Sequence, residues 1–414
     1  MKTRQPNSAT IDQRTNDRSS ISHLVRGGAL SIFQLGLMLA FLAVVTMTLP
    51  AQTLTTLHSF AGVPDGSNPS SAVVLDQDGN AYGTTFSGGN STFCNGGCGT
   101  VFKVAPDGTE TVFYNFAGKN DGANPNFLEL QGTNLVGTTL VGGLNGEKLR
   151  RFGLGTIFAV TLTGQKSLWH SFHGGVHAYP LGLSRAGAVT AGASLFKTNK
   201  RYNGSVMNSI TRNDRAVLKF HGSDPAAGEF PTAGLAFDAQ GNIYGTTMGG
   251  GTNGSGVLFE VGSGGEIILH NFGSGGGDAG EPSAGLTNDA QGNIYGTTTS
   301  GGSFGAGTVF EVTSSGIAIV HSFGGADGAG PESLLIFDAQ GNLYGTTAYG
   351  GLYNQGTVYE LSPTGLETVL YSFTGGTDGA GPRAALVFDT QGNLYGTTSS
   401  AGANGLGTVF KLVP

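Results

Sequence analysis

The chain has 414 residues, of which 74 are glycine and 11% are charged, and its formal net charge is −7. The glycines follow no strict third-residue period, which excludes collagen, and apolar residues recur in phase with them, which excludes a disordered linker. The charged residues form no helical pairing pattern. The composition therefore predicts short strands joined by tight turns.

Residues 1–51 are typical of a targeting segment and are not expected to be part of the fold. A polar stretch with five Lys or Arg side chains spans 1–28, and an almost wholly apolar run follows at 29–49. A positive flank, an apolar run and a small residue at Ala51 indicate an export signal. About 20 apolar residues can also span a bilayer, so an uncleaved signal anchor at 29–51 is the alternative. In both cases the rest of the chain is expected outside the cytoplasm, secreted or at the cell surface.

One phrase, Gly-Asn-x-Tyr-Gly-Thr-Thr, recurs along the remaining chain. It occupies 79–85, 241–247, 292–298, 341–347 and 392–398, and a weaker copy lies at 133–139. The gap between the copies at 133–139 and 241–247 is about twice the usual spacing, which predicts a degenerate copy at 187–194. Seven repeats of about fifty residues indicate an array or a closed ring.

Each repeat is predicted to form four short antiparallel strands. In residues 323–373, four apolar runs are separated by the turn sequences Asp-Ala-Gln-Gly-Asn and Ser-Pro-Thr-Gly and by a glycine-rich loop. This pattern predicts an all-β, seven-bladed β-propeller. The expected blades are 61–116, 117–172, 173–220 (degenerate), 221–272, 273–323, 324–373, and 374–414 completed by 54–60.

The two ends of the repeat region complement each other. Residues 54–60 resemble a lone fourth strand, and residues 407–414 resemble a lone third strand. Pairing of these two segments would complete the last blade and close the ring without a free sheet edge.

Cys94 and Cys98 are the two cysteines of the chain. A small loop disulfide is expected in an oxidising compartment, with free thiols as the alternative. A zinc site would need further Cys or His ligands at recognised spacing, and none lies nearby in the sequence.

The repeated sequences LxFDxQGNLYGTT, GTVFEL and ETVLYSF, followed by Gly-Gly and Asp-Gly, resemble the tandem GloVer (Gloeo/Verruco) repeat family. The resemblance covers residues 54–414. It implies an exported bacterial protein, and the family has no established activity or catalytic residues that could be carried over to this chain.

Two sets of repeated aspartates could hold a cation. One follows the fourth strand of each blade and comprises Asp65, Asp121, Asp278, Asp327 and Asp378. The other lies in the Asp-x-Gln-Gly-Asn turns and includes Asp238, Asp338 and Asp389. A calcium site needs ligands that converge on one point. Repetition around a ring instead favours hydrogen bonds from each aspartate to its own turn.

Histidines and cations gather in the second and third repeats. His170 occupies the same strand position as His58, His270 and His321, so we expect it to be structural, whereas His173 and His177 fall in the following loop. Residues 140–220 carry eleven Lys or Arg and two acids, and residues 221–414 carry two and sixteen. A ligand site is therefore a hypothesis for His173, His177, Arg150, Arg151, Lys200 and Arg201. The alternative is a degenerated blade whose surface has drifted.

The sequence thus favours a binding or scaffold module at the bacterial surface, without a cofactor or metal and monomeric. The expected ligand is a glycan or another surface protein, since basic and aromatic residues alternate too weakly for nucleic acid. A membrane is expected as a partner only through residues 29–51. One alternative is a polysaccharide lyase or hydrolase that uses His173, His177 and a carboxylate such as Glu147. The other is a purely structural spacer.

Overall fold

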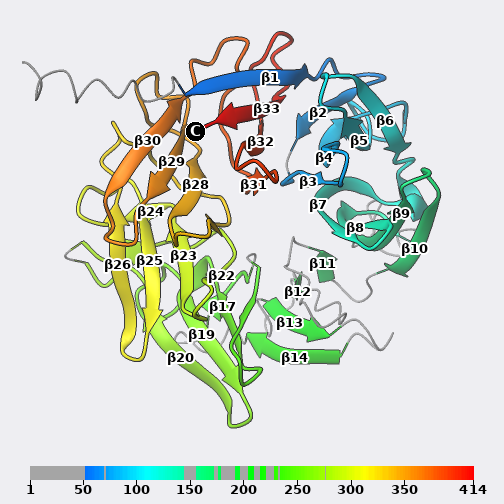
Figure 1. The fold of residues 1–414 in the computed structure, drawn as a ribbon. Helices are drawn as coiled ribbons and strands as arrows, with labels where there is room; N and C mark the ends of the chain where they lie inside the picture. Colours follow the sequence, from blue (N-terminus) through cyan, green and yellow to red (C-terminus); the bar gives the residue numbers. More distant parts are fainter. Residues whose placement is uncertain are drawn as a thin grey trace, which may run out of the picture. The chain divides into compact units, whose positions relative to one another are not determined.

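The computed structural model describes residues 52–69, 71–143, 155–171, 176–178, 192–195, 204–208, 215–220, 228–231, 234–275 and 277–414. Over these residues the protein is an all-β propeller (Figure 1). The one helical element in this part of the chain is a single 3-10 turn, η1 (Lys119–Asp121). No helix among the described residues has the length and apolarity to cross a membrane. The expected targeting segment lies outside them.

The strands form one sheet per repeat, numbered here as sheets 1 to 7 in chain order. Sheet 1 comprises β2 (Gly66–Pro69), β3 (Val74–Leu75), β4 (Ala81–Gly88), β5 (Thr100–Val104) and β6 (Glu110–Asn115). Sheet 2 comprises β7 (Ala123–Gln131), β8 (Asn134–Val141), β9 (Thr156–Thr161) and β10 (Lys166–Ser171). Sheet 3 comprises β11 (Val176–Ala178), β12 (Gly192–Leu195), β13 (Gly204–Asn208) and β14 (Arg215–Phe220).

The later repeats follow the same order. Sheet 4 comprises β16 (Ala236–Phe237), β17 (Ile243–Thr246), β19 (Val257–Gly262) and β20 (Gly265–Asn271). Sheet 5 comprises β22 (Thr287–Asn288), β23 (Ile294–Thr298), β25 (Thr308–Thr313) and β26 (Gly316–Ser322). Sheet 6 comprises β27 (Ile336–Phe337), β28 (Leu343–Thr347), β29 (Thr357–Leu361) and β30 (Glu367–Ser372). Sheet 7 comprises β31 (Val387–Phe388), β32 (Leu394–Thr398), β33 (Thr408–Val413) and β1 (Thr53–Ser59).

The strand count corrects one part of the expectation. Among the described residues, six sheets have four strands, but sheet 1 has five. The cause is the length of β4, whose start pairs with β3 at Tyr82 and whose end pairs with β2 at Gly88. In sheets 4 and 5 the equivalent pairings form separate small ladders, β15 (Gly228–Glu229) with β18 (Gly249–Gly250) and β21 (Ala279–Gly280) with β24 (Ser300–Gly301).

The predicted pairing of the two ends is confirmed. Strand β1 runs antiparallel to β33, with Leu54 opposite Leu412 and Ser59 opposite Thr408, and the two lie side by side in Figure 1. The amide of Phe60 continues the contact by donating to the carbonyl of Gly407 at 3.0 Å. Strand β33 is therefore paired on both sides, while β1 is the outer strand of sheet 7 and has one unpaired edge.

The recurring Gly-Thr-Thr sequence packs the second strand against the third in sheets 1, 2 and 4 to 7. A Cβ on Gly396 would lie 2.5 Å from Cζ of Phe410, so only glycine leaves room for that ring. The second threonine bonds the third strand, as in the 2.8 Å contact between Thr398 Oγ1 and Thr408 Oγ1. The phrase is thus a packing motif, and glycine is needed for close approach.

Aromatic side chains join neighbouring sheets. At five junctions between described residues, the phenylalanine that follows the fourth strand packs against the aromatic residue of the next sheet's third strand, edge-on in four of them and tilted in the fifth. Phe60 and Phe102 have ring centroids 5.0 Å apart with an interplanar angle of 62°. The same pairing recurs in Phe116–Phe158, Phe272–Phe310, Phe323–Tyr359 and Phe373–Phe410. The core is therefore a series of clusters between sheets.

Candidate functional site

Most of the predicted ligand residues lie outside the part of the chain that the structure describes. These are His173, Arg150, Arg151, Lys200 and Arg201. His177 lies in β11, where its backbone pairs with Ser194. The site hypothesis for the second and third repeats therefore stays a prediction.

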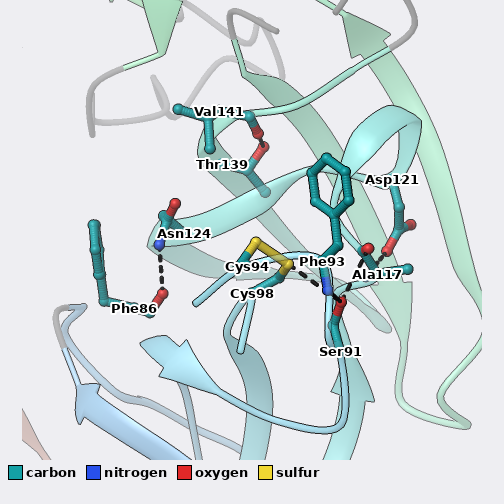
Figure 2. Close-up of a disulfide and its surroundings, with 10 residues drawn as sticks. All are labelled: Phe86, Ser91, Phe93, Cys94, Cys98, Ala117, Asp121, Asn124, Thr139 and Val141. Atoms are coloured by element: carbon teal, nitrogen blue, oxygen red, sulfur yellow. Dashed lines mark hydrogen bonds between the residues drawn. A yellow bond between two sulfur atoms is a disulfide. The ribbon is translucent and has the colours of Figure 1, made fainter. Parts of the chain in front are cut away.

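A disulfide joins Cys94 and Cys98 in the loop between β4 and β5 (Figure 2). Cys98 is fully buried in the core between sheets 1 and 2. The same loop holds the chain that leads into sheet 2, because the Ser91 hydroxyl donates to the Ala117 carbonyl at 3.1 Å and the Asn124 amide to the Cys98 carbonyl at 2.9 Å. The loop therefore links sheets 1 and 2 through hydrogen bonds.

The aspartates of both repeated sets are bound within their own turns, as expected. In the Asp-x-Gln-Gly-Asn turn of sheet 4, Asp238 accepts hydrogen bonds from the amides of Gln240 and Asn242 and from the Asn242 side chain. Asp278 likewise accepts from the Ser274 and Ala279 amides. These bonds hold each carboxylate against its own turn.

A feature that the sequence analysis missed lies at the junctions between sheets. At five junctions the aspartate after the fourth strand also contacts a His or Tyr of that strand. The pairs are His58–Asp65, Tyr114–Asp121, His270–Asp278, His321–Asp327 and Tyr371–Asp378. At two junctions a glutamate from the next sheet adds a second negative charge. Burial, and then the charge of Asp65, raise the pKa of Glu110 to about 7, and Glu367 beside Asp327 shows the same effect.

The cavities found among the described residues lie at the turns that join first and second strands; we call this side of sheets 4 to 6 the turn face. A cavity of about 1230 Å³ is lined by Leu235 and Asp238 of sheet 4, Leu286 and Gln291 of sheet 5, and Leu334 of the chain entering sheet 6. Cavities of about 500 and 300 Å³ lie between sheets 5 and 6 and between sheets 4 and 5.

Neighbouring sheets are linked where the large cavity forms. The Leu286 amide donates to the Gly234 carbonyl at 3.2 Å, and Asn288 Nδ2 donates to the Phe237 carbonyl at 3.2 Å. These bonds fix the two first strands side by side and so place the turns that follow, Asp238–Asn242 and Asp289–Asn293, at the same cavity.

The turn face is acidic over sheets 4 to 6. The residue opposite the repeated tyrosine on the third strand is Glu260, Glu311 or Glu360 there, but lysine in sheets 1 and 7. Burial, followed by the charge of Glu311, raises the pKa of Tyr295 to about 12, so the phenol stays protonated. Among the described residues that line the three cavities, none is Lys or Arg. The face therefore combines carboxylate, amide and phenol groups with leucine and phenylalanine.

Solved structures that resemble this chain are propellers of low sequence identity. The extracellular domain of a hybrid two-component system from B. thetaiotaomicron matches with a TM-score of 0.56 and 13% identity, over 87% of this chain and 41% of that chain. A second such domain from the same organism has a TM-score of 0.54 and 12% identity, over 86% of this chain and 39% of the other. A gluconolactonase from Xanthomonas campestris has a TM-score of 0.42 and 13% identity, over 88% and 92%.

The likenesses to the two extracellular domains establish the fold alone, and this chain spans about two fifths of those two chains. Comparison with curated protein sequences finds no significant match. The family model of the Gloeobacter/Verrucomicrobia repeat matches residues 43–192 and 191–410, which confirms the resemblance seen in the repeated phrases. The chain belongs to the Gloeobacter/Verrucomicrobia repeat family.

Proposed function

We propose that this protein is a binding module outside the cytoplasm whose ligand is a glycan held on the turn face of sheets 4 to 6. The observation that carries the proposal is the cavity of about 1230 Å³ between the turns of sheets 4 and 5. Ligand sites are concave, largely preformed, and combine apolar walls with a few convergent polar groups. The two smaller cavities continue along the same face, as an extended oligomer would require.

The chemistry of the lining favours a neutral sugar polymer. Amide and carboxylate groups such as Gln291 and Asp289 can donate to and accept from sugar hydroxyls. Leucine and phenylalanine side chains offer apolar surface to the C–H faces of a pyranose ring. The acidic side chains would repel uronate or sulfate groups, so we expect acidic glycans to bind poorly.

The cellular location and the closed ring belong to the same proposal. An apolar run at 29–49 and the likeness to extracellular propeller domains support a position at the cell surface. We treat the five-stranded sheet 1 as one blade, which with the six four-stranded sheets gives a ring of seven. Seven blades agree with the spacing of the repeated phrase.

The test uses a matched pair of exposed turn residues. Ala290 lines both the cavity of about 1230 Å³ and that of about 500 Å³, and Thr390 occupies the same place in the turn of sheet 7 but lines none of the three. The full chain, purified in mild detergent, is applied to a broad glycan array together with the variants Ala290→Trp and Thr390→Trp. The proposal predicts binding to neutral polysaccharide fragments, weakened at least about tenfold by A290W and unchanged by T390W.

The other outcomes separate the alternatives. If Arg150→Glu with Arg151→Glu abolishes binding and A290W does not, the ligand site lies in the second and third repeats and the turn-face proposal is wrong. A blank array would favour a structural spacer. Release of new reducing ends from a bound glycan would identify a glycan-cleaving enzyme.

A further inference from the structure

In sheets 1, 2, 5, 6 and 7 the first or second residue of the fourth strand changes in type from junction to junction. This residue lies six positions before the strand's closing phenylalanine. In these five sheets it faces the third-strand residue two positions after that strand's aromatic, as in Glu110 opposite Val104 and Lys166 opposite Val160. The equivalent positions in sheets 5, 6 and 7 are Ile317, Glu367 and Leu54.

At the junction of sheets 1 and 2 this position is occupied by Lys166, whose side chain carries a positive charge. The ammonium of Lys166 lies 2.5 Å from Oδ1 of Asp121 and also donates to the Asp121 carbonyl. The phenol of Tyr114 donates to the same carboxylate at 2.8 Å. A positive charge at this position can therefore pair with the aspartate that follows the fourth strand of the preceding sheet.

At the junction of sheets 7 and 1 the same place is taken by a carboxylate. His58 Nε2 lies 3.0 Å from Asp65 Oδ2, and the ligand atoms of His58, Asp65 and Glu110 all lie within 4.8 Å of one another. The His58 and Asp65 side chains are only 19% and 15% exposed. Oε1 of Glu110 is buried and has no hydrogen-bond partner among the described residues. Two carboxylates therefore converge on one imidazole where the neighbouring junction has a lysine.

We propose that His58, Asp65 and Glu110 bind a divalent metal ion of the zinc type. One imidazole nitrogen and two carboxylate oxygens are a donor set that zinc accepts, with water in the fourth position. Calcium requires six to eight oxygen ligands, which three side chains with one nitrogen donor do not supply. The ion would balance the two carboxylates as Lys166 balances Asp121. It would also tie β1, the strand that closes sheet 7, to the outer strand β6 of sheet 1. This proposal does not depend on glycan binding.

The test measures zinc binding by the full chain without an affinity tag, after removal of metals with a chelator. The native protein is expected to take up one Zn²⁺ per chain at neutral pH, by elemental analysis after dialysis, with a Tm raised by a few degrees over the chelated form. Glu110→Gln removes a ligand charge, and we expect it to weaken zinc affinity about 100-fold or more, since even second-shell changes cost 10–100-fold. Glu367→Gln, at the equivalent place near His321 and Asp327, is the matched control. The ligand atoms of those three residues do not all lie within 4.8 Å of one another, so this variant should bind zinc as the native chain does.

Glu110→Lys makes the experiment decisive, because it copies the neighbouring junction. This variant should bind no zinc, yet its Tm without metal should equal or exceed that of the chelated native protein, since the ammonium pairs with Asp65. Far-UV circular dichroism verifies that each variant is folded. The proposal is overturned if the native chain retains less than about 0.1 Zn²⁺ per chain, or if E110Q retains as much zinc as the native protein.

Discussion

Replacing Phe60 by alanine tests whether β1 is an integral part of the folded ring. Phe60 has no exposed surface, packs edge-on against Phe102 at 5.0 Å, and lies in the cluster between sheets 7 and 1 with Val409. Truncating a fully buried phenylalanine removes its burial and leaves a cavity, at a cost of about 3–5 kcal/mol. We therefore expect Phe60→Ala to lower the free energy of unfolding by that amount.

The assay is urea unfolding of the full chain in detergent, followed by far-UV circular dichroism. Fluorescence is a poor probe, because Trp169 is the one tryptophan and is 45% exposed. Phe304→Ala is the control, since its ring is 72% exposed and its loss should change stability by less than about 0.5 kcal/mol. A loss below about 1 kcal/mol in F60A would refute the reasoning, because β1 would then contribute little to the fold.

Two further changes test the packing motif and the junction charges. Gly396→Ala places a methyl group against the Phe410 ring and should lower the free energy of unfolding in urea by about 1–3 kcal/mol. Gly264→Ala is the control and should be nearly neutral, because the space around Gly264 is open. Equal effects of the two substitutions would contradict the packing account. Burial, and then the charge of Asp327, raise the pKa of Glu367 to about 7, so this carboxyl favours the folded state below pH 4.5 and loses that contribution as pH rises through 7. Between pH 4.5 and 8 the free energy of unfolding of the native protein should fall, and Glu367→Gln should reduce that fall by on the order of 1–2 kcal/mol after solvent screening. Parallel curves of unfolding free energy against pH for the two proteins would contradict this.

Features that depend on spacing within one repeat were predictable from the sequence. The repeated glycine and threonine act between adjacent strands of one sheet, so every copy reports the same local packing. The closing pair of strands could also be predicted, because residues 54–60 and 407–414 are halves of a unit that is complete elsewhere.

Features built between sheets were not predictable in the same way. The turn-face cavity depends on how Leu235 and Leu286 of different repeats come to lie side by side, which no local pattern encodes. His58 and Glu110 are far apart in sequence and meet because sheet 7 packs on sheet 1. An alignment of the repeats on the phenylalanine that follows the fourth strand would have revealed that Glu110 and Lys166 share one position. That alignment was the sequence signal available for this cluster.

The most direct test of the account is the location of the bound glycan. Hydrogen–deuterium exchange of the full chain would be compared with and without a neutral oligosaccharide identified on the array. The account predicts slower exchange in the turns at 238–242 and 289–293, which line the cavity of about 1230 Å³, and no change in the equivalent turn at 389–393 of sheet 7. Protection confined to the second and third repeats, or spread equally over all of these turns, would contradict it.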